Sequence, residues 1–311
     1  MNGTAVDEVG QVRAEAAVAQ GQARAGAGWL LPAALAVTVL TWASAFAGIR
    51  AGLAAFSPQS VALLRYATAS LVLAGYALVT RAPLPRPRDW LGLAGLGLVG
   101  ISVYNVALNQ GEVQLDAGTA SLIVASAPIY VALLAALFYK ERMTALRWAG
   151  IALSVAGVAL ISVDWRNGLH LTPSALLVLA AALAQAIYTV AQKAFLGRYA
   201  PIQLTSAAIW AGTLGLVWAL PGLTAELRTA PAGATAAVVY LGVFPGALGY
   251  VCWAYVISRL PAARAGTFLY LVPAAALFIA WVWLGETPAA AALAGGLLVV
   301  AGVAVVNWRK K

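Results

Sequence analysis

Charged residues are scarce in this chain: only 9% of its 311 residues are Asp, Glu, Lys or Arg, whereas 63% are hydrophobic. Soluble domains carry about 25% charged residues. A soluble fold of this length could not hide so much apolar surface in a single core. The composition therefore excludes a soluble globular protein and indicates that lipid is the solvent for most of the chain.

Cysteine and histidine are almost absent, with Cys252 and His170 as the only examples. One cysteine cannot form a disulfide within the chain. One Cys and one His supply neither a zinc site nor a Cys–His or Ser–His–Asp catalytic arrangement. The sequence also has no glycine-rich phosphate-binding motif, which argues against ATP hydrolysis. We therefore expect no catalytic residue, no metal and no cofactor, and we disfavour an intramembrane enzyme or a receptor.

Long apolar runs follow a polar N-terminal stretch. Residues 1–28 are polar with mixed charges and lack the apolar core of a signal peptide, so we expect a disordered cytoplasmic tail. A membrane span needs about 20 mostly apolar residues, which form a helix because backbone groups in lipid must be satisfied within the segment. Ten runs qualify as spans: 29–49, 58–80, 90–110, 117–139, 146–163, 173–193, 201–221, 233–257, 265–284 and 289–308.

The basic residues sort to one side of these spans. A net charge of +9 would be compatible with nucleic-acid binding in a soluble protein. Here, however, the Lys and Arg residues lie mainly in short loops between apolar runs. Arg50, Arg166 and Arg228 fall on one side, Arg65 lies inside a span, and the other fifteen fall on the opposite side. By the positive-inside rule this bias places both termini in the cytoplasm.

An internal repeat divides the chain into two halves. Residues 91–163 align without a gap on residues 236–308 at an offset of 145 positions. The aligned pairs include two prolines and two glutamates: Pro128 with Pro273, and Glu141 with Glu286. We therefore predict an all-α membrane fold of two five-helix repeats, residues 29–163 and 173–308. Because five is odd, the second repeat is inverted relative to the first, as in many transporters that bind substrate between their halves.

These features resemble the drug/metabolite transporter superfamily, and within it the EamA-type exporters. The resemblance rests on the ten spans, the two repeats, the Trp-Ala-Ser-Ala-Phe stretch at 42–46 and the paired segments 128–141 and 273–286. It implies export of a small polar metabolite across a bacterial inner membrane by alternating access, with no nucleic-acid partner. A narrower resemblance, to YddG-type exporters, implies neutral or aromatic amino acids as substrates. Exporters of drugs or sugar-type metabolites by proton antiport remain the alternative.

Two polar faces on the predicted spans are candidates for lining a transport path. The third span carries one at helical spacing: Ser102, Asn105, Asn109 and Glu112. The sixth span carries the other: Gln185, Tyr188, Thr189 and Gln192. Polar residues within a span usually face the bundle interior or a water-filled path. We interpret Asn105, Asn109, Gln185 and Tyr188 as cavity residues, with hydrogen bonding between helices as the alternative.

Aromatic residues and helix breakers add further candidates. Five aromatic residues lie away from the span ends, where rings can stack on a substrate or simply pack between helices: Trp42, Tyr130, Tyr250, Trp253 and Tyr270. Four breakers occupy paired positions in the two halves: Gly100 with Pro245, and Pro128 with Pro273. Paired breaks indicate a binding site or a moving element, and a static kink is the alternative.

The charged residues near the spans leave the energy source open. Arg65 can snorkel to the outer surface, pair with Glu112 or Asp116, or meet a substrate carboxylate. No carboxylate lies near a span midpoint, so facilitated or gradient-driven export is favoured over strict proton antiport. Glu141 and Glu286 sit at span ends, where we expect them to fix helix ends by hydrogen bonding to loop backbone. The oligomeric state stays open, and a monomer is compatible with the sequence.

Overall fold

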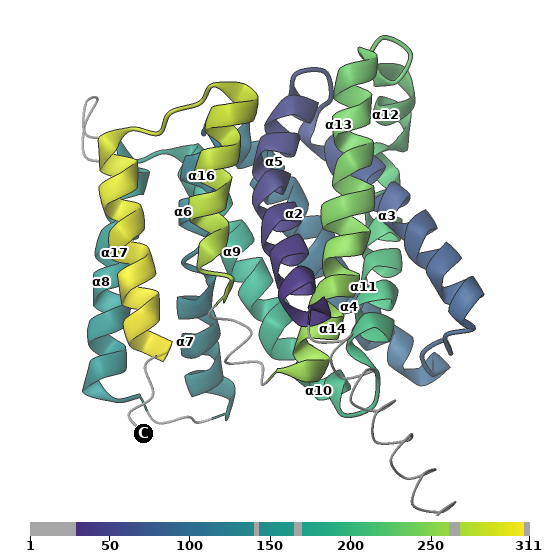
Figure 1. Cartoon of the computed structure of the whole chain (residues 1–311), viewed down its shortest axis with the longest axis horizontal. Coiled ribbons are helices and arrows are strands. Elements are labelled where there is room, and N and C mark those ends of the chain that lie inside the picture. The colour runs from purple at the N-terminus through teal and green to yellow at the C-terminus, as the bar shows by residue number, and fades with distance from the viewer. Residues whose placement is uncertain (1–28, 140–142, 165–169, 261–267, 308–311) are drawn as a thin grey trace, which may run out of the picture.

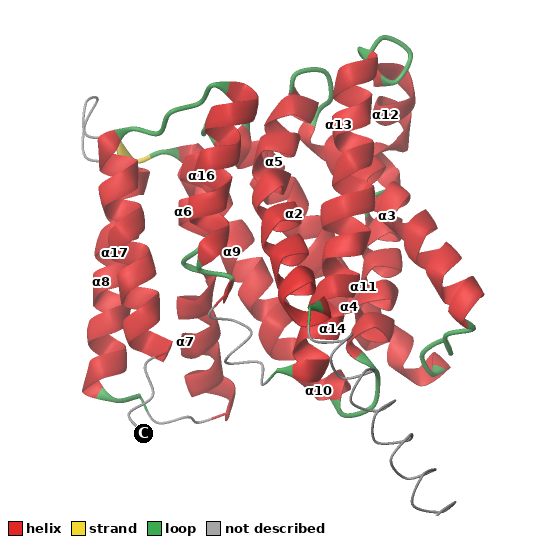
Figure 2. Ribbon diagram, in the orientation of Figure 1, coloured by secondary structure: helices red, strands yellow, loops and turns green. Residues whose placement is uncertain are grey.

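The computed structural model describes residues 29–139, 143–164, 170–260 and 268–307, and nearly all of them are helical (Figures 1 and 2). The first half contains α2 (Leu30–Leu53), α3 (Pro58–Thr80), η1 (Pro87–Asp89), α4 (Trp90–Gly97), η2 (Leu98–Val103), α5 (Tyr104–Glu112), α6 (Ala117–Val124), α7 (Ala127–Tyr139) and α8 (Ala145–Ser162). The second contains α9 (Pro173–Ala191), α10 (Lys193–Leu196), α11 (Pro201–Gly215), η3 (Val217–Ala219), α12 (Leu220–Glu226), α13 (Ala232–Val243), η4 (Phe244–Leu248), α14 (Gly249–Arg259), α16 (Leu271–Leu284) and α17 (Ala290–Asn307).

The fold departs from the all-α expectation at one short connection. Strands β1 (Val163–Asp164) and β2 (His170–Leu171) pair antiparallel between α8 and α9. Elsewhere the helices begin where the sequence dictates. Pro58, Pro173 and Pro201 each stand at the start of a helix, where the N–H that proline lacks would have no partner within the helix.

Seven of the described helical segments are long and apolar enough to cross a membrane. An eighth results if Pro201–Gly215 and Val217–Glu226, which are bent by 43° at their junction, form one span. Two further apolar helices, Leu271–Leu284 and Ala290–Val306, are shorter. The ninth predicted span begins at residue 265, outside the described residues, so the count of ten stays a prediction.

The outer faces of the bundle are apolar, as lipid contact requires. Large side chains such as Leu71, Val79 and Leu297 are 75%, 86% and 74% exposed. A single large apolar cluster fills the interior between α2, α3, α5, α6, α9, α13 and α16. In Figure 1, α2 runs through the middle of the molecule, with α16 on one side and α13 on the other.

Helices α8 and α17 lie side by side at one edge of the bundle (Figure 1). Their backbones touch through paired glycines. A Cβ atom at Gly157 would lie 2.5 Å from the Gly295 carbonyl oxygen, and one at Gly150 would lie 2.7 Å from that of Gly302. Such close contact through small residues is the usual means of joining membrane helices.

We expect Gly157→Ala to destabilise the folded protein by about 1–3 kcal/mol, because the added methyl group pushes α8 away from α17. The measurement is the apparent Tm of the purified protein in detergent. Gly75→Ala is the matched control, since a Cβ there meets nothing within 4 Å, and it should leave the Tm unchanged or slightly raised. Equal Tm values for the two variants would contradict the contact.

Candidate functional site

A line of buried polar side chains runs along α5. Asn105, Asn109 and Glu112 are each 0% exposed, although they belong to a membrane-embedded helix. Ser102, one turn earlier, donates a 2.7 Å hydrogen bond to the Gly212 carbonyl oxygen of α11. Ser102 therefore forms a hydrogen bond between two helices, which was the alternative to a cavity role. The other three side chains face the interior between α5 and its neighbours.

Asn105, the first residue of this line, is hydrogen-bonded to groups on two helices. Its Nδ2 donates to the Tyr66 hydroxyl oxygen at 3.0 Å and to the Ile101 carbonyl oxygen at 2.8 Å. Its Oδ1 accepts a 3.3 Å hydrogen bond from Arg65 Nη1. Every polar atom of the Asn105 amide group is thus engaged, and two of its partners lie on α3.

Arg65 does not reach the surface. Its side chain is buried, only 6% exposed, with the guanidinium 5.1 Å from the centre of the Tyr66 ring. The snorkelling interpretation was therefore wrong, because the rotation of α3 in the bundle points this side chain inward. Among the described residues the ion pairs join Arg50 to Glu286 and Arg198 to Asp89, and neither involves Arg65.

Unpaired polar atoms concentrate on this line. Five buried side-chain atoms of the described residues have no hydrogen-bond partner. Three belong to this line, Asn109 Oδ1 and Glu112 Oε1 and Oε2, and a fourth is Nε of Arg65 on α3, which bonds Asn105 of the line. Asn109 uses only its Nδ2, which donates to the Pro58 carbonyl oxygen at 2.9 Å. Buried polar groups are normally paired, because leaving one unpaired costs about 1–3 kcal/mol. Such a concentration therefore indicates a place for a ligand, a proton or water.

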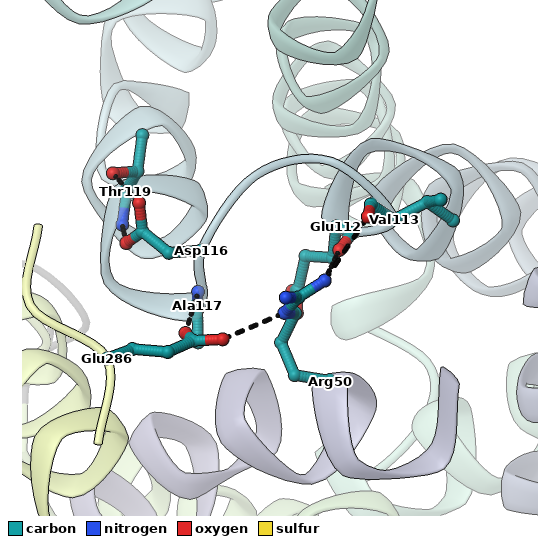
Figure 3. A network of polar contacts seen from close by, with 7 residues as sticks. All are labelled: Arg50, Glu112, Val113, Asp116, Ala117, Thr119 and Glu286. Carbon is teal, nitrogen blue, oxygen red and sulfur yellow. Dashed lines mark hydrogen bonds and ion pairs between the residues drawn. The ribbon is translucent and has the colours of Figure 1, made fainter. Parts of the chain in front are cut away.

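A charged network lies at the Glu112 end of the line, where Arg50 stands in the last turn of α2 (Figure 3). Arg50 Nε pairs with Glu286 Oε1 at 3.0 Å, and Arg50 Nη1 donates to the Glu112 carbonyl oxygen at 2.6 Å. Glu286 Oε2 accepts a 2.8 Å hydrogen bond from the Ala117 backbone N–H at the start of α6. Glu286 therefore fixes a helix end, as predicted, whereas its repeat partner Glu141 lies outside the described residues.

Asp116 adds a second carboxylate to the same helix start. Its Oδ1 accepts from the Thr119 backbone N–H at 2.7 Å, and its Oδ2 accepts from the Thr119 hydroxyl at 2.6 Å (Figure 3). Negative charge at a helix N-terminus is stabilising. The network thus joins α2, α5, α6 and the segment after α16 in one arrangement.

Trp42, Tyr250 and Trp253 form an aromatic cluster beside the polar line. The Trp42 ring lies 5.3 Å from that of Tyr250 in an edge-on contact, and 5.6 Å from that of Trp253. Gly249 makes this approach possible, since a Cβ there would lie 2.8 Å from Trp42 Nε1. Tyr250 packs against the apolar cluster that contains Tyr66, the residue next to Arg65 in the chain.

Tyr188 of α9 packs on a glycine of the first half, as Trp42 of α2 packs on Gly249 of the second half. Tyr188 is 6% exposed, and its ring packs on Gly100, where a Cβ would overlap the ring. Gly100 lies in η2, a π-helical turn, and Pro245 lies in the π-helical turn η4. Gln185, one turn before Tyr188, is half-buried and accepts a 2.7 Å hydrogen bond from the Thr189 hydroxyl through its backbone oxygen.

The remaining candidates lie elsewhere. Tyr270 packs against the cluster of Ile129 and Val299 at the α7–α8–α17 side. Tyr130 is half-buried on α7. Two sequence-based breaks lie in the first turn of a helix. Pro128 is the second residue of α7, after α6 ends at Val124, and Pro273 is the third residue of α16.

A second polar network lies at the opposite end of the bundle, and the sequence analysis missed it. Asp89 Oδ1 pairs with Arg198 Nη1 at 2.7 Å, and Asp89 Oδ2 accepts from the Tyr199 hydroxyl at 2.5 Å. The Tyr199 hydroxyl in turn accepts a 3.0 Å hydrogen bond from the Arg86 backbone N–H. The network links η1 to the turn after α10. The sole sign of this network in the sequence is that its residues lie in short loops between predicted spans.

This bundle of apolar helices around a buried polar line defines a multi-span membrane transporter. The family model of EamA-like transporters matches the chain twice, over residues 29–163 and 172–308. The chain therefore belongs to the EamA-like transporter family, which confirms the resemblance found in the sequence.

Several relatives are similar over most of their length. The chain is 46% identical over 276 residues to a probable terminal-alkyne amino-acid exporter of Streptantibioticus cattleyicolor, which covers 89% of this chain and 93% of that one. It is 40% identical over 262 residues to the transporter YdfC of Bacillus subtilis, covering 84% and 86%. It is 27% identical over 278 residues to a probable amino-acid metabolite efflux pump of Salmonella typhimurium, covering 86% and 91%.

A solved crystal structure shares the fold. It superposes with a TM-score of 0.60 at 20% sequence identity, covering 88% of this chain and 95% of that one.

We expect Asn105→Leu to destabilise the protein by about 1–3 kcal/mol, because it removes the acceptor of Arg65 Nη1 and leaves the buried cation without a partner. The measurement is again the apparent Tm in detergent. Asn109→Leu, which loses a single hydrogen bond, should cost less. Adding Arg65→Met to Asn105→Leu should recover part of the loss, and a further loss instead would contradict the dependence of Arg65 on Asn105.

Proposed function

We propose that this protein exports neutral amino acids with apolar side chains across a bacterial inner membrane by alternating access. The observation that carries the proposal is the buried polar line on α5, with its unpaired donor and acceptors, next to the Trp42 aromatic cluster. Polar groups of both kinds suit a zwitterion, and the rings suit an apolar side chain. The names of the relatives from Streptantibioticus cattleyicolor and Salmonella typhimurium support this substrate class.

The proposed architecture is ten transmembrane helices in two inverted repeats, residues 29–163 and 173–308. The double match of the family model supports it. So do reciprocal contacts between the halves. Trp42 of α2 packs on Gly249 beside η4, and Tyr188 of α9 packs on Gly100 within η2. An inverted repeat produces such pairs because each half meets the other through equivalent elements.

The proposed cycle opens one end of the bundle while the other is closed. The Arg50–Glu286 network seals the outer end, and the Asp89–Arg198–Tyr199 network seals the inner end. The π-helical turns η2 and η4 and the breaks before Pro128 and Pro273 serve as bending points, since breaks in a helix allow its halves to move separately.

Both termini lie in the cytoplasm in this proposal. The positive-inside bias of the sequence supports this orientation. The start of α2 and the end of α17 lie at the same end of the bundle (Figure 1). The Arg50–Glu286 network, at the far end of α2, then faces the outside.

Proton antiport, of amino acids or of drug or sugar-type substrates, is a second candidate that one observation favours. Glu112 does not lie near a span midpoint, yet its carboxylate is fully buried and unpaired. Arg50 bonds the backbone oxygen of Glu112 and pairs with Glu286, so charged side chains from other segments lie close to this residue. A buried carboxylate of this kind is a usual proton site in transporters.

Purified protein in liposomes should exchange labelled L-phenylalanine and L-propargylglycine for internal unlabelled amino acid without a pH gradient. Uptake that requires the gradient would establish antiport instead. Absence of exchange for every neutral amino acid, with sugars or cationic drugs transported, would overturn the substrate class.

Trp42→Ala should lower the exchange rate at least about 10-fold, since an aromatic contact and its apolar area are lost. Trp281→Ala is the matched control, because Trp281 is 57% exposed on the outer surface of α16. The assay is initial rate at equal protein incorporation. Equal rates for Trp42→Ala and the control would remove the aromatic cluster from the transport path.

A further inference from the structure

We propose that the unpaired atoms of α3 and α5 form the head-group site for a zwitterionic α-amino acid, with its carboxylate on Arg65 and its ammonium on Asn109 and Glu112. The inference rests on the proposed function and assigns the residues and the polarity of binding. It starts from four unpaired atoms, one on Arg65 of α3 and three on Asn109 and Glu112 of α5.

The carboxylate of the ligand would bind Arg65, a buried cation with an unpaired N–H donor. Arg65 is 6% exposed, one of its nitrogens is held by Asn105 at 3.3 Å, and its Nε has no partner. Guanidinium groups bind carboxylates through paired, charge-assisted hydrogen bonds. Asn105 and the Tyr66 ring fix the orientation of the group, so the donor edge is already in place when the ligand arrives.

The ammonium end offers acceptors alone. Asn109 commits its NH₂ group to Pro58 and leaves Oδ1 free, and both carboxylate oxygens of Glu112 are free. The two residues are three positions apart on α5 and so share a face. Arg50 does not neutralise this carboxylate by a direct contact, because it bonds the backbone oxygen of Glu112 and pairs with Glu286.

The spacing fits an amino-acid head group. Asn105, which holds Arg65, and Glu112 are seven residues apart on α5, or about 10 Å along the helix axis. That length accommodates the short distance between the ammonium and carboxylate of one molecule, with a hydrogen bond of about 2.8 Å at each end. A ligand with only one charge would leave one end of the line unpaired.

The side chain of the ligand is directed to the aromatic cluster. Tyr250 packs against the apolar cluster that contains Tyr66, which follows Arg65 in the chain, and Trp42 packs against both Tyr250 and Trp253. An apolar or aromatic side chain next to the carboxylate therefore meets these rings. The head group supplies charge recognition, and the rings select an apolar side chain.

Binding of three matched compounds to the purified full-length protein tests the assignment. They are L-phenylalanine, phenethylamine, which lacks the carboxylate, and 3-phenylpropionate, which lacks the ammonium. We expect each single-charge compound to bind at least about 10-fold more weakly than L-phenylalanine, because one charged hydrogen-bonding end is lost. The readout is competition with radiolabelled L-phenylalanine on the solubilised protein, which does not depend on transport.

Two substitutions assign the ends. Arg65→Gln should weaken L-phenylalanine at least about 10-fold and leave phenethylamine within about two-fold, since that compound has no carboxylate to lose. Glu112→Gln should weaken L-phenylalanine and leave 3-phenylpropionate unchanged. Glu226→Gln is the control carboxylate, because Glu226 accepts from the Ser57 backbone N–H away from the line. If Arg65→Gln does not fold, Arg65→Lys, which keeps the charge but loses the planar guanidinium, takes its place. It should weaken the two compounds that carry a carboxylate, L-phenylalanine and 3-phenylpropionate, more than it weakens phenethylamine.

The outcomes separate this inference from the proposed function. If the wild type binds and exchanges L-phenylalanine but neither Arg65→Gln nor Glu112→Gln alters the ranking of the three compounds, the site is overturned and the exporter stands. If Glu112→Gln binds all three like the wild type and loses only pH-driven exchange, Glu112 carries a proton and the ammonium assignment is overturned. If the wild type neither binds nor exchanges any neutral amino acid, both proposals fail.

Discussion

The hydrogen bond between Asn105 and Arg65 is the contact on which the interior of this protein depends. A guanidinium in a lipid-embedded bundle is costly unless polar partners surround it. Asn105 supplies one such partner and is itself held by Tyr66 and by the backbone of Ile101. This arrangement fixes how α3 and α5 face each other, and it leaves donor and acceptor atoms free in a space that lipid does not reach.

Small residues make the rest of the bundle possible. Between α8 and α17 the glycines bring two backbones into contact, and at Gly100 and Gly249 they admit aromatic rings from the other half of the chain. Both kinds of contact depend on the absence of a side chain at one position. The first kind makes a rigid pair at the edge, whereas the second lies beside the π-helical turns, where helices can bend. The positions of the glycines thus determine which part of the bundle is a rigid helix pair and which part can bend.

Much of this structure was readable from the sequence, and the misses have physical causes. Hydropathy and Pro58 gave α3 its bounds, the repeat pointed to Glu286 as a residue that fixes a helix end, and helical spacing put Asn105 and Asn109 on one inner face. Periodicity does not give the rotation of a helix that is apolar nearly all round, so the burial of Arg65 was missed. Helical spacing also put Glu112 on that face, but it could not show that Arg50 bonds its backbone oxygen and leaves its carboxylate unpaired. Depth in a span likewise does not reveal which neighbour a ring meets, and Tyr270 packs against the cluster of Ile129 and Val299.

The most direct test of the account is a crystal structure of the protein grown with 4-bromo-L-phenylalanine, whose bromine is located by anomalous scattering. The account predicts one strong bromine peak beside the rings of Trp42, Tyr250 and Trp253, with ligand density extending to Arg65 and Glu112. A peak confined to the outer groove lined by Ser70, Trp210 and Thr213, with the polar line on α5 unchanged and unliganded, would contradict it.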